Sequence, residues 1–381
     1  MSELAPKTEP ARLHPISRVH LDELTDAVGI MQHAIGERPD PAHGYCTDDV
    51  ARALIVDLLH GAELGWAAVA PTVAISMAFL DAAFDRSSGR FRNFRDVEGQ
   101  WLEDVGSEDA HARAVLALGE ASASAGDARV CAAAASLFEQ ALPATLRLTY
   151  LRPLAAAIVA TDAAIRGGSR DAVSAMPPLA AAVRLLTEPL PRVPSAEWPW
   201  PEPVLAYENG LVPRALIVAG DRLGDGAMVE RGLHLLDWLV AVQTAPEGHF
   251  SPIGSDGWWP YGGRRARYDQ QPIEATALLL AAEAAFAATG QRRHLATMDW
   301  AYGWFLGQND GGRAVALPAT GGGHDGLTPS GVNLNQGAES TLMWLIALER
   351  IRAARRGARM GVPSSTRRPP GRRRIHEAAF T

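Results

Sequence analysis

Carboxylates recur where apolar segments of the sequence begin. Asp48 and Asp49 stand between "HGYC" and "VARALIV", and Glu108 and Asp109 stand between "VGS" and "AHARAVLAL". Comparable places are held by Glu208, Asp269, Glu274 and Glu339. Such acids have two explanations. The first turn of a helix stabilises a carboxylate by roughly 0.3 to 1 kcal/mol, whereas two carboxylates that face one cleft supply the acid and the base of glycoside hydrolysis.

The distribution of these acids favours a shared cleft. The helices expected near residues 66 and 292 carry no acid in their first turn, although capping would favour one there equally. Simple explanations stay open for each single acid, because Thr47 and Ser107 are good N-caps. Asp48 with Arg52, and Asp109 with Arg113, have the i,i+4 spacing of helical ion pairs.

Alanine-rich runs with helical periodicity predict an all-α fold of about twelve helices. The expected spans are 17–36, 47–64, 66–85, 107–125, 127–147, 151–166, 171–188, 208–223, 226–244, 269–289, 292–307 and 338–356. Short and long links largely alternate, which places the long, Trp-rich loops at one end of a stack of helical hairpins. Long loops of this kind are usually functional. A faint repeat, "RALIV" at 52–56 and 214–218 with "RAVLA" at 113–117, supports the hairpin design.

Four motifs carry a family resemblance: "HGYCTDDVARAL", "WLEDVGSEDAHARAVLALG", "DQQPIEA" and "NLNQGAESTLMWL". They resemble motifs of an uncharacterised bacterial group, described as glycosyltransferase-associated or glycosidase-like, within the six-hairpin (α/α)6-toroid superfamily. The resemblance covers roughly residues 17–350 and implies a sugar-binding cleft at one end of the inner helices. We expect one toroid domain over 17–356, an N-terminal extension over 1–16 and a basic, disordered tail over 357–381.

These observations predict a carbohydrate-active enzyme, in first place an inverting glycoside hydrolase. We expect Asp109 to be the general acid and Asp49 the base, with Glu208 and Asp269 as alternatives for the base. Aromatic candidates for stacking on sugar rings are Tyr45, Trp101, Trp198, Trp200, Tyr207, Trp258 and Trp259, although the tryptophans equally suit packing of the loops. Polar candidates for substrate binding are His43, Asp48, Arg52, Glu108, His111, Arg113, Gln270, Glu274, Asn335 and Glu339.

Composition excludes several other classes of protein. The 381 residues carry a net charge of −7, which argues against specific nucleic-acid binding. Two cysteines and a polar N-terminus without a signal peptide predict a cytoplasmic protein, and no apolar run predicts a membrane span. Neither HExxH nor CxxC occurs, so we expect no metal and no cofactor.

Two alternatives to hydrolysis stay open. A sugar epimerase, a lyase or a phosphorolytic enzyme can use the same scaffold, because fold does not fix reaction. His43 or His111 would then supply the acid–base chemistry. The chain can also be a non-catalytic glycan-binding partner of a glycosyltransferase. In every case the expected ligand is an oligosaccharide or a glycoside.

Overall fold

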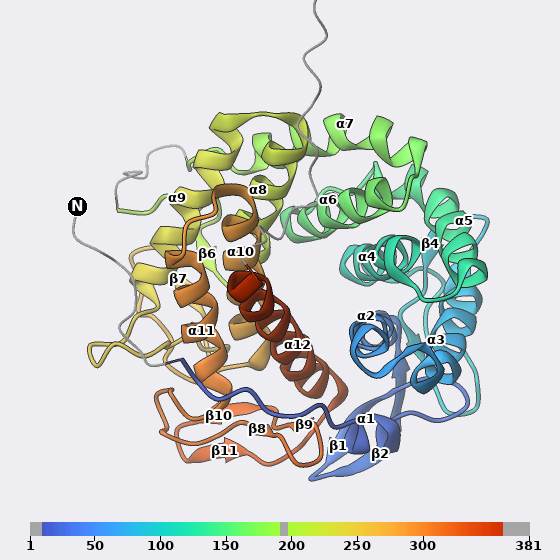
Figure 1. Cartoon of the computed structure of the whole chain (residues 1–381), viewed down its shortest axis with the longest axis horizontal. Helices are drawn as coiled ribbons and strands as arrows, with labels where there is room; N and C mark the ends of the chain where they lie inside the picture. The colour runs from blue at the N-terminus through green and yellow to red at the C-terminus, as the bar shows by residue number, and fades with distance from the viewer. Residues whose placement is uncertain (1–9, 191–196, 361–381) are drawn as a thin grey trace, which may run out of the picture.

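Six helices form a closed inner ring around the axis of the molecule (Figure 1). The structure, a computed structural model, describes residues 10–190 and 197–360. The inner helices are α2 (Thr47–Leu64), α4 (Glu108–Ser124), α6 (Leu151–Arg166), α8 (Leu211–Leu223), α10 (Pro272–Thr289) and α12 (Ala338–Met360). Each packs against the next along the chain, and α12 packs against α2, which closes the ring.

An outer ring of helices covers the inner one. Each outer helix packs on the inner helix that precedes it in the sequence: α3 (Ala70–Ala83), α5 (Ala128–Thr145), α7 (Arg170–Leu186), α9 (Gly226–Val242) and α11 (Arg293–Phe305). The sixth outer place is taken by the short α1 (Val19–Leu24), which contacts α12. The expected all-α fold with about twelve helices is therefore confirmed.

The first expected helix, over 17–36, is wrong beyond Leu24. The side chain of Asp26 accepts hydrogen bonds from the backbone N–H groups of Val28 and Gly29, at 2.7 and 3.1 Å. This local turn satisfies backbone donors that a continuing helix would use. The chain then forms β1 (Met31–Ile35), which pairs antiparallel with β2 (Arg38–Cys46).

The inner helices approach one another closely because small residues line their contacts. A Cβ added to Gly119 on α4 would lie 2.4 Å from the carbonyl oxygen of Ala160 on α6, so only glycine fits there. Among the described helices, α10 alone is long and apolar enough to span a membrane, and 61% of that stretch is buried inside the ring. Its apolar character is thus explained by its place in the core.

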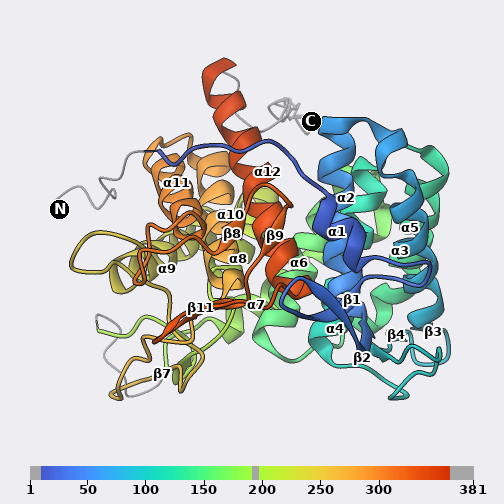
Figure 2. The same ribbon diagram turned by 90° about the horizontal axis from the view of Figure 1, so that it is seen from below.

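Short strands decorate the long loops. They are β3 (Phe84–Asp85), β4 (Arg90–Phe91), β5 (Phe94–Arg95), β6 (Val204–Leu205), β7 (Trp259–Pro260), β8 (Ala316–Leu317), β9 (Gly322–Gly323), β10 (Gly326–Thr328) and β11 (Gly331–Asn333), with a 3-10 turn over Trp66–Ala68. Figure 2 shows strands such as β2, β4, β7 and β11 toward one end of the helices, opposite the C-terminal end of α12. The long loops lead into the N-terminal ends of inner helices, as the alternation of link lengths predicts.

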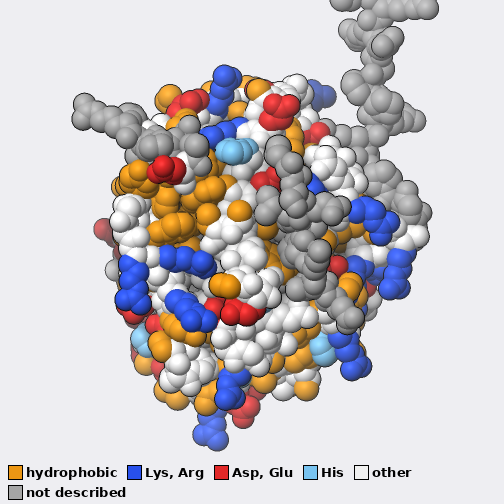
Figure 3. Space-filling model, turned by 90° about the vertical axis from the view of Figure 1, so that its left-hand side faces the viewer, with side chains coloured by type: hydrophobic (Ala, Val, Ile, Leu, Met, Phe, Trp, Pro, Cys, Tyr) orange, Lys and Arg blue, Asp and Glu red, His pale blue; other side chains and the backbone are white. Residues whose placement is uncertain are grey.

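The helix α12 continues to Met360, four residues past the expected end at residue 356. The expected basic tail from residue 361 onward, and residues 1–9 of the expected N-terminal extension, lie outside the described residues. On the side of the molecule that carries α9 and α11, basic and acidic side chains are interspersed rather than segregated (Figure 3).

Candidate active site

A cleft of about 480 Å³ opens at the loop end of the inner ring. Its walls come from β1, the first turns of α2 and α12, and the loops around residues 255, 269 and 325–333. The lining residues are Gln32, His33, Cys46, Asp48, Asp49, Arg52, Phe94, Ser255, Asp269, Gln271, Asp325, Gly326, Thr328, Asn333, Gly337, Glu339 and Ser340. Five of these side chains are carboxylates and one is a guanidinium, so the cleft is strongly acidic.

Asp49 lies at the buried base of this cleft. Its side chain is 4% exposed, and Oδ1 accepts a 2.8 Å hydrogen bond from Arg52 Nη1. The buried thiol of Cys46 donates to Oδ2 at 3.1 Å, so Cys46 is a small buried partner of the acid. Burial raises the pKa of Asp49 to about 6, although Arg52 opposes the shift. Asp49 therefore holds its proton more tightly than an ordinary aspartate does.

Arginines join the acids of the inner helices into one network. Arg52 also pairs with Glu339 on α12 at 2.8 Å. Arg113 on α4 lies 3.4 Å from Asp48 and makes two contacts with the Glu208 carboxylate, one of them at 3.1 Å. Among the described residues, neither predicted i,i+4 pair is made: Arg52 instead pairs with Asp49 within α2 and with Glu339, and Arg113 pairs with Asp48 and Glu208. Burial alone would raise the pKa of Glu208, but Arg113 outweighs it and holds that pKa below its ordinary value.

Glu274 holds the turn that carries Glu208. The carboxylate of Glu274 is buried on α10 and accepts hydrogen bonds from the backbone N–H groups of Glu208 and Asn209 and from the Asn209 side chain, the last at 2.9 Å. Glu208 has a φ of 48° and precedes α8, which begins only at Leu211. The expected helix start at residue 208 is therefore wrong, and Glu274 acts on the backbone rather than on a substrate.

Asp109 lies beside the cleft rather than in its lining. Its Oδ2 accepts a 3.1 Å hydrogen bond from the hydroxyl of Tyr207, and burial raises its pKa. Tyr207 in turn lies under the guanidinium of Arg152, at 4.6 Å, and 6.4 Å from the ring of Trp258. Tyr207 and Trp258 thus lie beside Asp109, and their contact with a substrate stays a prediction. Ser107 caps α4 through a 3.0 Å bond from Ala110, whereas Thr47 donates to the Arg92 carbonyl and caps nothing.

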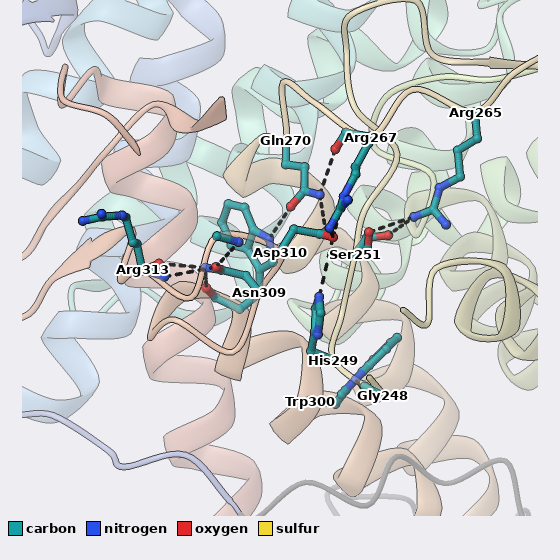
Figure 4. A network of polar contacts seen from close by, with 12 residues as sticks. Gly248, His249, Ser251, Arg265, Arg267, Gln270, Trp300, Asn309, Asp310 and Arg313 are labelled. Carbon is teal, nitrogen blue, oxygen red and sulfur yellow. Dashed lines mark hydrogen bonds and ion pairs between the residues drawn. The ribbon is translucent and has the colours of Figure 1, made fainter. Parts of the chain in front are cut away.

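Asp269 lines the cleft from the loop before α10, and its neighbour Gln270 belongs to a polar network that fixes this loop (Figure 4). The Asp269 side chain is exposed, and helix α10 begins after it, at Pro272 rather than at residue 269. Its neighbour Gln270 donates to the carboxylate of Asp310 at 2.5 Å and accepts from Trp304 at 3.0 Å. Because both ends of its amide are used and it is absent from the cleft lining, Gln270 positions the loop.

Most of the predicted aromatic platforms pack the loops instead. Trp198 and Trp200 are 3% and 0% exposed and contact Trp238, so neither ring presents a face to a sugar. Trp259 stacks on Trp238 in the same cluster, and Trp101 packs edge-on against Phe79. The packing alternative therefore holds for these four rings, because the Pro-rich and Gly-rich loops need apolar anchors.

Several polar candidates also have structural partners. Tyr45 is buried and donates to Asp26, and His111 is buried against Phe91 and Thr145, which leaves neither for a substrate. Glu108 accepts from the backbone N–H groups of Thr149 and Tyr150. Asn335 accepts from the Gly36 N–H at 3.0 Å. The exposed His43 lies edge-on to His33, 4.6 Å away, at the rim of the cleft.

Sequence reasoning missed a second wall of the cleft. His33 lies on β1, a segment that the sequence pattern predicted to be helical. Asp325 and Asn333 come from the loop before α12, where the "GGGHDG" run was a usable signal for a built loop. Asp325 is fixed there by the Gly337 N–H, which donates to its Oδ1 at 2.9 Å. Phe94 is placed by β5, whose backbone pairs Phe94 with Cys46.

Phe94 offers the cleft an aromatic face, because its ring lines the cleft and the residue is 39% exposed. We expect Phe94→Ala to raise KM for an oligosaccharide roughly tenfold, a loss of about 1.4 kcal/mol of binding, with kcat largely kept. The matched control is Tyr261→Ala, since Tyr261 is 40% exposed in the Trp198 cluster, outside the lining of the cleft. Equal kinetic effects in the two variants would contradict a substrate contact at Phe94.

Comparisons with known proteins place this geometry on a known scaffold. No family model matches the sequence, and no curated protein matches it. Cellobiose 2-epimerase from Spirochaeta thermophila matches over 87% of this chain and 92% of its own, with a TM-score of 0.65 and 14% identity. The chain has the six-hairpin (α/α)6 toroid fold.

Two further structures show how widely this toroid is used. A D-mannose isomerase matches over 88% of this chain and 94% of its own, with a TM-score of 0.65 and 11% identity. The GH76 α-mannanase BT2949 from Bacteroides thetaiotaomicron matches over 90% and 94%, with a TM-score of 0.61 and 9% identity. At these identities the likeness concerns the fold, because isomerases, epimerases and a glycosidase match it about equally well.

Proposed function

We propose that this toroid is an inverting glycoside hydrolase in which Asp49 is the proton donor and Asp269 the base. The observation that carries the proposal is the acidic cleft at the loop end of the ring, with one buried carboxylate whose pKa is about 6 and an exposed carboxylate on the facing loop. Asp49 would protonate the glycosidic oxygen as its bond to the anomeric carbon breaks. Asp269 would take a proton from the water that attacks this carbon.

This assignment differs from the expected roles in two ways. Asp109 gives up the acid role, because its side chain is absent from the cleft lining and accepts a hydrogen bond from Tyr207. Glu208 gives up the base role, because Arg113 engages both of its oxygens. Among the described residues, no side chain makes a hydrogen bond or ion pair with the Asp269 carboxylate, so it is accessible to water.

A second candidate function is sugar epimerisation or isomerisation, favoured by His33. Its imidazole lines the cleft and contacts the ring of His43. A histidine has the pKa that suits proton abstraction next to a carbonyl. The hydrolase comes first because the cleft offers one imidazole against five carboxylates.

The test is to incubate the protein with a panel of oligosaccharides in D2O and follow the products by NMR. Hydrolysis releases a new reducing end, and the first anomer formed tells inversion from retention. Epimerisation or isomerisation through a carbanion instead exchanges the C2 hydrogen for deuterium without bond cleavage. Deuterium at C2 with no cleavage would overturn the proposal and assign the chemistry to the His33 side of the cleft.

The charge of the cleft also predicts which sugars it accepts. Five carboxylates face one guanidinium, so uronates should be repelled and neutral sugars accepted. We expect kcat/KM for an oligosaccharide to fall at least about tenfold when a neutral unit is replaced by its uronate, and the difference to shrink as salt rises. Glu339→Gln removes one of the five carboxylates, so it should reduce the difference in kcat/KM between the neutral and the uronate substrate. A preference for the uronate in wild type would contradict this account.

A further inference from the structure

Three cavities lie in series along the axis of the toroid. The cleft at the loop end shares Arg52 with a narrow waist of about 50 Å³. The waist shares Glu120, Arg214, Leu280 and Arg350 with a larger cavity of about 650 Å³. Helix α12 runs from Glu339 in the cleft to Arg350 at the larger cavity, a rise of about 16 Å. The larger cavity, here called the far cavity, is therefore distinct from the cleft.

The far cavity combines an apolar wall with charged side chains. The wall comes from α6, α8 and α10 and includes Val159, Ile217, Val218, Leu280 and Ala284. Most of the charges belong to arginine–carboxylate pairs. Arg222 contacts Asp162 at 2.5 Å, and Arg166 contacts Glu120 at 3.3 Å.

Two arginines of the far cavity, Arg214 and Arg350, are paired with carboxylates less closely or not at all. Among the described residues, neither the Arg214 guanidinium nor the Arg350 guanidinium makes a hydrogen bond. The carboxylate oxygens nearest to Arg350 belong to Glu283 and Glu120, at 3.8 and 3.9 Å, and its Nε is buried without a partner. A guanidinium presents five N–H donors, and leaving a buried donor unmet is costly.

The internal repeat allows Arg214 to be compared with two arginines at equivalent positions. Its three copies place Arg52, Arg113 and Arg214 on the inner ring, where all three border the waist. Arg52 and Arg113 each engage two carboxylates, whereas Arg214 has no ion pair among the described residues. Burial and the nearby charge of Arg350 lower the pKa of Arg214, although nearby carboxylates partly oppose the shift. An anion placed between Arg214 and Arg350 would relieve both effects.

We propose that the far cavity is a second binding site, for a small organic monocarboxylate whose carboxylate lies between Arg214 and Arg350. The apolar body of the ligand lies along the wall from α8 and α10. A monoanion fits better than a phosphate dianion, because the lining carries as many acidic as basic side chains: Glu120, Asp162, Asp221 and Glu283 against Arg166, Arg214, Arg222 and Arg350. The site does not depend on the reaction assigned to the cleft.

Benzoate is a suitable probe, with benzamide as its neutral isostere and inorganic phosphate as the competing anion. In titration calorimetry at pH 7 the wild-type chain should bind benzoate saturably at one site, and benzamide and phosphate at least tenfold more weakly. Absence of saturable benzoate binding, or equal binding of benzamide or phosphate, would overturn the proposal.

Variants locate the binding. Arg214→Met and Arg350→Met should each weaken benzoate binding at least tenfold, whereas Arg293→Met, on the outer helix α11, should leave it unchanged. Ala284→Phe narrows the apolar wall without altering any charge, so it tests the site even where an arginine variant folds poorly, and it too should block binding. Asp49→Asn should bind benzoate as wild type does, which separates this site from the cleft. Wild-type affinity in both Arg214→Met and Ala284→Phe would overturn the assignment.

Discussion

Asp49→Asn should lower kcat on a cleaved oligosaccharide by about a thousandfold, because asparagine keeps the size of the side chain but has no proton to give to the leaving oxygen. The base of the cleft should keep its shape, since the amide oxygen still accepts from Arg52. The measurement is steady-state cleavage by wild type and variant at equal folded concentration, verified by circular dichroism. A folded variant that retains more than about a tenth of wild-type kcat would remove Asp49 from the acid role.

Asp57→Asn is the matched control for this experiment. Asp57 is on the same helix, is buried, and has a pKa that burial likewise raises to about 6. It pairs with Arg18 at 2.7 Å and is absent from the cleft lining. We therefore expect kcat of folded Asp57→Asn to stay near the wild-type value. The comparison separates loss of a catalytic proton from loss of a buried acid.

The pH profile gives a second view of the same group. A proton donor acts only while it is protonated, so activity should be lost as pH rises through about 6, roughly tenfold for each further unit. Bound substrate excludes water from the cleft and raises the pKa of Asp49 further. The loss of activity should therefore occur at a higher pH in kcat than in kcat/KM. A rate that rises between pH 6 and 8 would instead indicate that the ionised form of Asp49 is the active one.

Much of the ring architecture was predictable because its helices carry strong local signals. Alanine-rich segments with short Gly-containing links predict eleven of the helices, and the predicted boundaries lie within a few residues of the observed ones. The prediction of the first helix was wrong beyond Leu24, because residues 25–46 combine helix-like apolar spacing with residues that favour turns. The turn at Asp26 ends the helix there. Because this region was predicted to be helical, the β1–β2 pair was not predicted, and His33 on β1 was not identified as a candidate.

The site was predictable only in part, because sequence spacing does not show which side chains of a loop face the cleft and which pack the loop onto the helices. Acids at the starts of inner helices were found correctly as neighbours, since ring closure brings α2 and α12 together. Which of these acids line the cleft and which only support it could not be predicted, because that depends on contacts between distant segments, such as Arg113 with Glu208. The tryptophans misled for a related reason: an aromatic ring in a long loop serves equally to bind a sugar or to hold the loop.

Glu274 is the buried acid whose removal should cost the most stability. Glu274→Ala would leave the backbone N–H groups of Glu208 and Asn209 without their side-chain acceptor, and the Asn209 side-chain amide would lose one of its two acceptors. At about 1 to 3 kcal/mol for each unmet buried donor, we expect the free energy of unfolding to fall by at least about 3 kcal/mol. Urea unfolding followed by circular dichroism measures it. Glu283→Ala, on the same helix but only loosely paired with Arg350, should cost less than about 1 kcal/mol.

The pH dependence of this effect follows from the direction of the shift. Burial raises the pKa of Glu274 from 4.5 to about 7, so the folded protein binds this proton more tightly than the unfolded chain. The resulting stability is fully present below pH 4.5 and is lost as pH rises through about 7, a change of about 3 kcal/mol. Glu274→Gln cannot titrate, so wild type should lose stability relative to it over this range. A constant difference between the two would mean that Glu274 is ionised in the fold, and that the Glu208 turn is held by a charge.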